Sequence, residues 1–192
     1  MTRNNVIGVT GITGSGTSTA AKILAERGGL VINADKLAHE IMLKGEAAYE
    51  KITEAFGAEI LDGGGEINRR KLGIKVFGNA AEMAKLENII HPEVIAKAEI
   101  LLQNNQHPFA VIDAPMLIES GMNKLCGMVW LITANDDIRL ARIQARDGIS
   151  QETAERRLKS RKGDDFLKSY ADVIIENNGS LHDLESKILK GL

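Results

Sequence analysis

Apolar residues gather in five short, nearly continuous runs, and the polar residues between them follow a helical spacing. Strands that helices cover on both faces have this composition, because neither face meets water. Strand-like runs that alternate with helical patterns are typical of an α/β fold with a parallel sheet and right-handed crossovers. The predicted strands are Val6–Thr10, Leu30–Asn33, Phe109–Asp113, Met128–Ile132 and Asp172–Glu176.

The octet Gly11–Ser18 lies between the first predicted strand and a helical pattern that begins near Thr19. A strand, a glycine loop and a helix in this order are the context of a phosphate-binding loop. Backbone N–H groups of such a loop converge on an anion, and the positive end of the helix dipole adds to the attraction. Thr17 stands where the Walker A motif has lysine, so the loop lacks the usual cation. A simple tight turn is the alternative interpretation.

About 75 residues separate the second and third predicted strands, far more than an ordinary crossover needs. We expect a helical insertion at the C-terminal edge of the sheet, where ligands bind in such folds, with plain helical decoration as the alternative. The predicted helices are Lys36–Leu43, Ala47–Phe56, Arg70–Phe77 and Ala80–Leu102.

A very polar segment, residues 149–168, lies between the last two predicted strands. Pairs such as Glu152–Arg156 have the i,i+4 spacing of a solvated helix face. In a phosphate-binding fold the segment also fits a mobile lid that brings cations over a triphosphate. We favour the lid, and the two interpretations are compatible.

Composition narrows the classes of function. The 192 residues carry a net charge of −2, which argues against general binding to nucleic acid or anionic membranes. No apolar stretch reaches membrane-spanning length, and Met1–Asn5 lead into the first strand without a signal-peptide pattern, so we expect a cytoplasmic protein. The single cysteine, Cys126, precedes an apolar run and is predicted to be a structural thiol. The four histidines lack metal-ligand spacing, so no zinc site is expected.

Six further segments, taken in order with the glycine loop, resemble one known family. They lie within Val31–His39, Phe56–Leu72, Leu86–Val94, Ile112–Glu119, Arg139–Asp147 and Ala171–Gly179. The family is the dephospho-CoA kinases. The resemblance implies transfer of the γ-phosphoryl group of ATP, with Mg²⁺, to the ribose 3′-hydroxyl of dephospho-CoA, the last step of coenzyme A biosynthesis.

The resemblance also implies a domain organisation. A P-loop NTPase core with a five-stranded parallel sheet would comprise residues 1–35, 108–145 and 170–192. A helical CoA-binding insertion would comprise residues 36–107, and a helical lid residues 146–169.

The same resemblance, together with the loop, assigns candidate site residues. Those for ATP are Gly11, Thr13, Gly14, Ser15, Gly16, Thr17, Ser18, Thr19, Asn177 and Asn178. Those for dephospho-CoA are Asn33, Arg70, His91 and Glu119, and the catalytic candidates are Asp35, Arg142 and Arg146. Ser18 and Asp113 are expected to bind Mg²⁺, although Ser18 also fits a plain helix start and Asp113 a structural hydrogen bond.

Three departures from the family pattern affect the chemistry: Thr17 for lysine, Asn33 for a carboxylate, and Arg161 for glutamine. Asn33 cannot accept the proton of an attacking hydroxyl, a loss of about 10²–10⁴-fold on the general-base scale. Asp35 can serve as the base if the strand continues past Asn33, or it can cap the next helix. Lys36 or Arg161 can replace the lost cation, although a plain surface charge is the favoured interpretation of both residues.

These departures leave two alternatives to an active dephospho-CoA kinase. One is a catalytically weakened paralogue that binds nucleotide or CoA. The other is a kinase of the same fold with a different acceptor.

Overall fold

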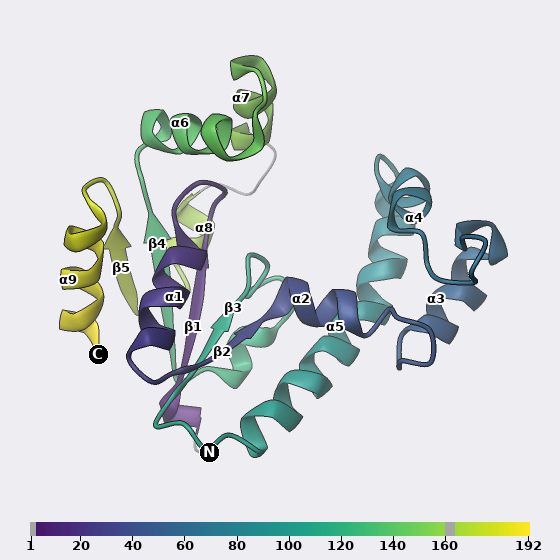
Figure 1. Cartoon of the computed structure of the whole chain (residues 1–192), viewed down its shortest axis with the longest axis horizontal. Helices are drawn as coiled ribbons and strands as arrows, with labels where there is room; N and C mark the ends of the chain where they lie inside the picture. The colour runs from purple at the N-terminus through teal and green to yellow at the C-terminus, as the bar shows by residue number, and fades with distance from the viewer. Residues whose placement is uncertain (1–2, 160–163) are drawn as a thin grey trace. The chain divides into compact units, whose positions relative to one another are not determined.

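The computed structural model describes residues 3–159 and 164–192, which form an α/β fold (Figure 1). The strands are β1 (Val6–Gly11), β2 (Leu30–Asn33), β3 (Ala110–Asp113), β4 (Met128–Thr133) and β5 (Val173–Glu176). The α-helices are α1 (Thr17–Glu26), α2 (Ala34–Glu40), α3 (Tyr49–Phe56), α4 (Arg69–Val76), α5 (Ala80–Gln103), α6 (Asp136–Asp147), α7 (Gln151–Lys159), α8 (Asp164–Lys168) and α9 (Leu181–Gly191). Short 3₁₀ turns are η1 (Arg3–Asn5), η2 (Ala58–Ile60) and η3 (Met122–Leu125).

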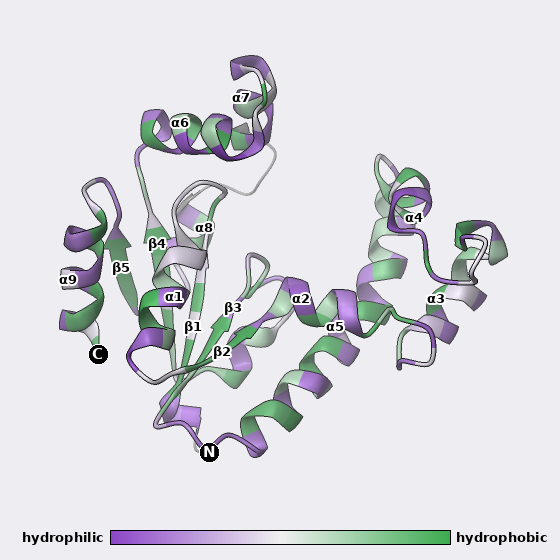
Figure 2. Ribbon diagram, in the orientation of Figure 1, coloured by the Kyte–Doolittle hydropathy of each residue, from purple (hydrophilic) through white to green (hydrophobic). Residues whose placement is uncertain are grey.

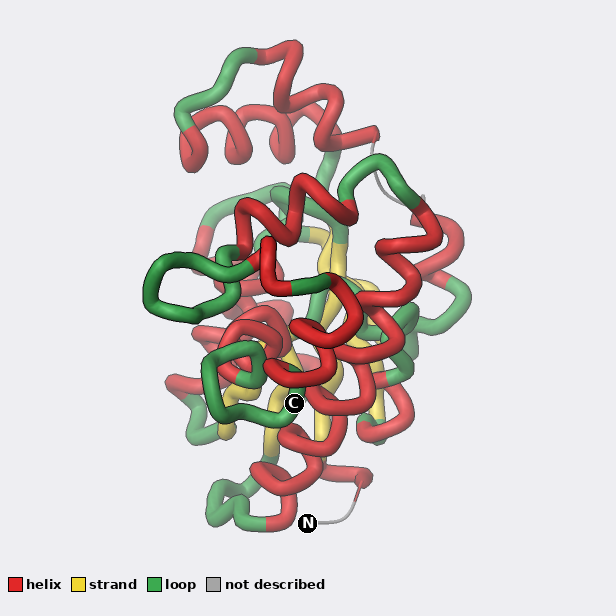
Figure 3. The backbone as a smooth tube through the Cα atoms, turned by 90° about the vertical axis from the view of Figure 1, so that its right-hand side faces the viewer, coloured by secondary structure: helices red, strands yellow, loops and turns green. Residues whose placement is uncertain are grey.

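The strands form one sheet in the order β2-β3-β1-β4-β5, and they run side by side in Figure 3. β1 pairs in parallel with β3 on one side and with β4 on the other, and β4 pairs in parallel with β5. The predicted strands are thereby confirmed, with ends that differ by one residue at most. In Figure 2 the strands β3 and β4 are mainly hydrophobic, as expected for strands covered on both faces. The edge strand β5 is also hydrophobic, but its Ile174 is exposed.

Contacts divide the chain into two compact units, Met1–Ile32 with Asn105–Leu192, and Asn33–Asn104. In the first unit, helices α1 and α9 pack on one face of the sheet around the fully buried Trp130. On the other face, a side chain on Gly8 would lie 2.6 Å from Leu117 Cδ2 and 2.7 Å from Cys126 Sγ. The glycine therefore lets the segment after β3 pack closely against the central strand.

The second unit consists of α2, α3, η2, α4 and α5. Its core is apolar and includes Leu37, Ile52, Phe56, Ile60, Leu72, Val76, Leu86 and Val94. Asparagine side chains start two of its helices: Asn68 Oδ1 accepts from two N–H groups of α4, and Asn79 Oδ1 from two of α5. None of the helices in residues 3–159 and 164–192 combines the length and the apolar character needed to span a bilayer.

The start of α2 corrects the expectation that a helix begins at Lys36. Asn33 Oδ1 accepts the N–H of Lys36 at 2.8 Å, so Asn33 is the N-cap and the helix begins at Ala34. β2 ends at Asn33 and Asp35 lies in the first turn of α2. The strand therefore does not continue to Asp35, and the expectation that Asp35 caps this helix is wrong.

Candidate active site

The glycine loop follows β1, the central strand, and leads into α1. Gly14 and Gly16 have φ angles of 85° and 100°, in the left-handed region that favours glycine. Ser15 N donates to Ile12 O at 3.0 Å, and Gly16 is the N-cap residue of α1, with no side chain to occupy the first-turn N–H groups. These N–H groups and the helix dipole form a seat for an anion.

Close packing explains why three positions of the loop are glycines. A Cβ on Gly11 would lie 2.5 Å from Ile132 O, and one on Gly14 would lie 2.9 Å from Arg139 O. A Cβ on Gly16 would lie 2.3 Å from Asn177 Nδ2. The three glycines therefore let β4, α6 and the segment after β5 approach the loop.

Three successive carbonyl groups of the loop accept hydrogen bonds from side chains outside it. Arg139 Nε donates to Thr13 O at 3.0 Å and Arg142 Nη1 to Gly14 O at 3.4 Å. Asn177 Nδ2 donates to Ser15 O at 2.8 Å. Because these carbonyls turn toward the surrounding elements, the conformation of the loop is fixed from outside. Such a loop is preorganised for anion binding by its amides.

Asn177 directly follows β5 and forms hydrogen bonds both to the end of β4 and to the glycine loop. It is 6% exposed, and its backbone N–H donates to Thr133 O at 2.7 Å. Its Oδ1 accepts from Arg142 Nη2 at 3.4 Å, so it links α6 to the loop. Asn178 Oδ1 accepts from Asn135 N at 2.8 Å, next to the start of α6. The structure thus gives Asn177 a loop-supporting contact, and the expected contact of both residues with ATP stays a prediction.

The arginines of α6 differ in what they contact. Arg139 is 4% exposed, and its Nη1 also donates to Asp136 Oδ1 at 2.7 Å. Arg146, in contrast, is exposed and forms a two-point ion pair with Asp147, at 2.7 and 3.0 Å. The hydrogen bond from Arg146 lowers the pKa of Asp147, and Arg157 pairs with the same carboxylate from α7. In this structure Asp147 therefore joins α6 to α7, while Arg146 pairs with it from within α6. The catalytic role of Arg146 stays a prediction.

The residues expected to bind Mg²⁺ both lie in the first unit. Asp113 is 4% exposed at the end of β3, where it aligns with Val9 of β1. Ser18 is exposed in the first turn of α1. A carboxylate and a hydroxyl are oxygen ligands of the kind that Mg²⁺ prefers, and the ion usually takes only one or two protein ligands beside substrate phosphates. The donor set therefore fits an ion that arrives with ATP.

A family model described as dephospho-CoA kinase matches residues 5–183. The chain belongs to the dephospho-CoA kinase family. A dephospho-CoA kinase of Fusobacterium nucleatum is 40% identical over 183 residues, which cover 95% of this chain and 94% of that protein.

Solved structures agree with this membership. The crystal structure of TT1252 from Thermus thermophilus matches with a TM-score of 0.84 and 31% identity, covering 100% of this chain and 99% of that one. A dephospho-CoA kinase from Campylobacter jejuni matches with a TM-score of 0.68 and 33% identity over 98% of this chain and 95% of that one. A shikimate kinase from Acinetobacter baumannii, at 18% identity and a TM-score of 0.53, shows the fold alone. The P-loop fold inferred from the sequence is thereby confirmed.

The other predicted residues of this family member are not among those that contact the loop in the first unit. Asn33, Asp35, Arg70 and His91 all belong to the second unit, Asn33 as a helix cap and Arg70 as an exposed residue of α4. Glu119 lies in the first unit, and its Oε2 is buried without a hydrogen-bond partner among the described residues. Their contacts with dephospho-CoA stay predictions. Arg161 lies outside the described residues.

Arg139 lies in a segment that resembles the family, but it is not among the predicted site residues. Nothing in the local sequence indicates that its guanidinium is buried against residue 13. The only signal is Asp136 three residues earlier, which identifies a helix-surface pair but not its neighbour across the fold.

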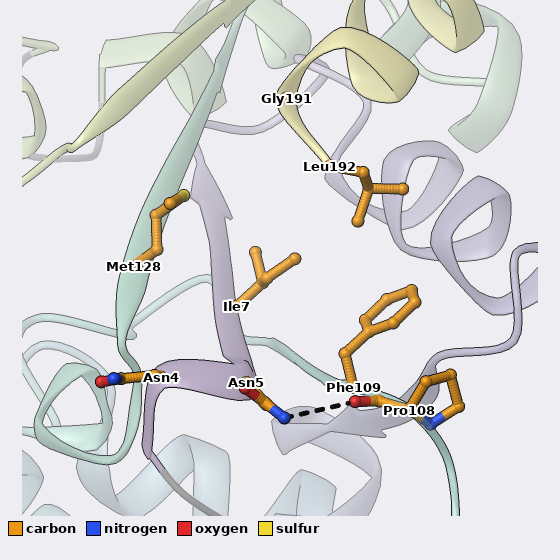
Figure 4. Close-up of a pocket in the computed structure, with 8 residues that line it drawn as sticks. All are labelled: Asn4, Asn5, Ile7, Pro108, Phe109, Met128, Gly191 and Leu192. Carbon is orange, nitrogen blue, oxygen red and sulfur yellow. Dashed lines mark hydrogen bonds between the residues drawn. The ribbon is translucent and has the colours of Figure 1, made fainter.

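A pocket of about 270 Å³ lies at the end of the sheet opposite the glycine loop (Figure 4). It is lined by Asn4, Asn5, Ile7, Pro108, Phe109, Met128, Gly191 and Leu192. Ile7 and Met128 are at the beginnings of β1 and β4, whereas the glycine loop follows the end of β1. The pocket is mainly apolar and is separate from the phosphate seat.

Proposed function

We propose that this protein transfers the γ-phosphoryl group of MgATP to the ribose 3′-hydroxyl of dephospho-CoA, giving CoA. The observation that carries the proposal is the glycine loop, held open for an anion, in a chain that matches the dephospho-CoA kinase family over residues 5–183. Phosphoryl transfer proceeds through a loose transition state, so positioning and charge neutralisation account for most of the catalysis. The preorganised amides of this loop supply both.

The proposal also assigns roles to the other predicted site residues. Ser18 and Asp113 hold Mg²⁺ with the ATP phosphates, and Arg142 stabilises the charge on the transferring group. Residues 36–107 bind the CoA moiety through Arg70 and His91, and residues 146–169 form the lid. Because β2 ends at Asn33, the alignment of Asp35 along a continued strand is lost, and its role as base rests on its place in the first turn of α2. From there it would take the proton from the attacking hydroxyl.

A coupled assay that measures ADP formation with MgATP and dephospho-CoA tests the reaction. We expect turnover that depends on both substrates, with mass spectrometry showing the CoA product. Thr17→Lys and Asn33→Asp should each raise the rate, since the first adds a cation at the phosphates and the second a carboxylate at the acceptor. An unchanged rate in both variants would contradict the roles given to these positions.

A second candidate is a nucleotide-binding paralogue with little catalytic power. It is favoured by Thr17 and by Asn33, whose Oδ1 already accepts from Lys36 N. MgATP binding without any ADP formation would support this candidate. ADP formation with another hydroxyl acceptor, but none with dephospho-CoA, would indicate a changed acceptor.

A further inference from the structure

The loop lacks a lysine at position 17, but an arginine side chain from α6 contacts it. Arg139 of α6 is buried to 4% exposure, and its Nε donates to Thr13 O at 3.0 Å. Its neighbour one turn later, Arg142, donates to Gly14 O at 3.4 Å. Both guanidinium groups therefore contact the loop from a single helix.

The charge of Arg139 is only weakly balanced where it lies. Its ion-pair partner is Asp136, at 2.7 Å, but the Asp136 side chain is 82% exposed. A carboxylate in water is screened, and a backbone carbonyl carries no net charge. Burying an arginine in such surroundings is unfavourable unless an anion offsets the desolvation. An ATP phosphate in the seat beside Thr13 and Gly14 would be that anion.

Both the side chain and the backbone of Arg139 contact the loop. Nε fixes a carbonyl of the loop, and the backbone of Arg139 itself lies against Gly14, where a Cβ would be 2.9 Å from its carbonyl oxygen. Hence a shift of this residue would shift the loop. In Walker A loops, the lysine lies over the β- and γ-phosphates and supplies positive charge from within the loop.

We propose that Arg139 is a positioning residue that replaces part of the function of the missing lysine, holding the loop and supplying its positive charge from α6. The inference rests on the proposed use of MgATP but not on the identity of the acceptor. It predicts that positions 139 and 17 are energetically coupled, because a lysine at 17 would supply the same charge.

The test is a double-mutant cycle with Arg139→Met, Thr17→Lys and the double variant, read out as the Kd for MgATP by calorimetry without any acceptor. Arg139→Met alone should weaken binding about 10- to 100-fold, the range for losing a charge-assisted hydrogen bond. In the Thr17→Lys background, the fold-loss of MgATP affinity caused by Arg139→Met should be less than a third of the fold-loss seen with Thr17 present. Arg139→Lys, which keeps the charge, should recover part of the binding.

The matched control is Arg27→Met, which removes an exposed arginine of the same unit that pairs with Glu185. It should leave the Kd for MgATP unchanged. Melting temperatures are measured for every variant, and if Arg139→Met does not fold, the cycle is repeated with Arg139→Gln, which also removes the charge. Equal losses of affinity in both backgrounds, or no loss, would overturn the proposal. Because no acceptor is present, a coupled cycle without turnover on dephospho-CoA would reject the proposed function and leave this inference standing.

Discussion

At the scale of single residues, the loop depends on the absence of a side chain at position 16. Gly16 has φ 100°, and a Cβ there would lie 2.3 Å from Asn177 Nδ2. Asn177 would have to give up its hydrogen bond to Ser15 O to make room. We expect Gly16→Ala to weaken MgATP binding tenfold or more, by about 1.4 kcal/mol, as measured by calorimetry.

A control separates the clash from backbone strain. Gly121 has φ 80°, but a Cβ there would meet nothing within 4 Å. Gly121→Ala therefore carries only the left-handed penalty of about 1–2 kcal/mol in the free energy of unfolding. MgATP affinity should be unchanged in this variant. Equal effects of the two substitutions on affinity would mean that Asn177 does not hold the loop.

At the scale of elements, the start of α9 offers a second prediction. Ser180 Oγ accepts the N–H of Asp183 at 3.2 Å, and the Asp183 carboxylate accepts the N–H of Ser180 at 2.8 Å. Ser180→Ala should lower the free energy of unfolding by about 1 kcal/mol in urea titrations. Ser180→Asn, which keeps a capping oxygen, should lose much less, and an equal loss would contradict the capping role.

The pH dependence of this cap follows from its carboxylate. The hydrogen bonds from Ser180 hold the pKa of Asp183 below its ordinary value. A lowered pKa means that the contribution of Asp183 is present above the ordinary value and is lost as the pH falls through the folded-state pKa. The stability difference between the wild type and Ser180→Ala should therefore be constant from pH 5 to 8 and shrink in strong acid, as urea titrations at each pH would show.

The elements themselves were largely predictable, whereas the contacts of the site were not. Continuous apolar runs gave the strands to within one residue, because period and composition are local properties. The start of α2 was misplaced because Asn33 and Asp35 are both good cap residues and only the backbone decides between them. The bond from Arg139 to Thr13 joins residues 126 positions apart, and no local pattern encodes it.

At the scale of the whole molecule, Cys126 can report opening of the first unit. It is the only cysteine, it is 4% exposed, and burial raises the pKa of its thiol to about 12. At pH 8 the folded thiol is ionised to about one part in 10⁴, so alkylation requires opening. A raised pKa favours the folded state below the ordinary value, and this contribution is lost as the pH rises toward 12.

We expect iodoacetamide to label native Cys126 very slowly at pH 8, and MgATP at 100 times its Kd to slow the labelling about 100-fold. The measurement is mass spectrometry of quenched samples, with unfolded protein in urea as the fully reactive control. Labelling that is fast, or that does not respond to MgATP, would show that the thiol is reached by a local motion apart from the loop.

The sheet order places β1 between β3 and β4, so the strand that carries the loop is bonded along both sides. Amide protons of such a strand exchange with solvent only when the neighbouring strands separate as well. The loop proposed to bind phosphate thus follows the strand that opens last. Warming the protein should loosen the edge strands β2 and β5 well before it loosens β1 and this loop.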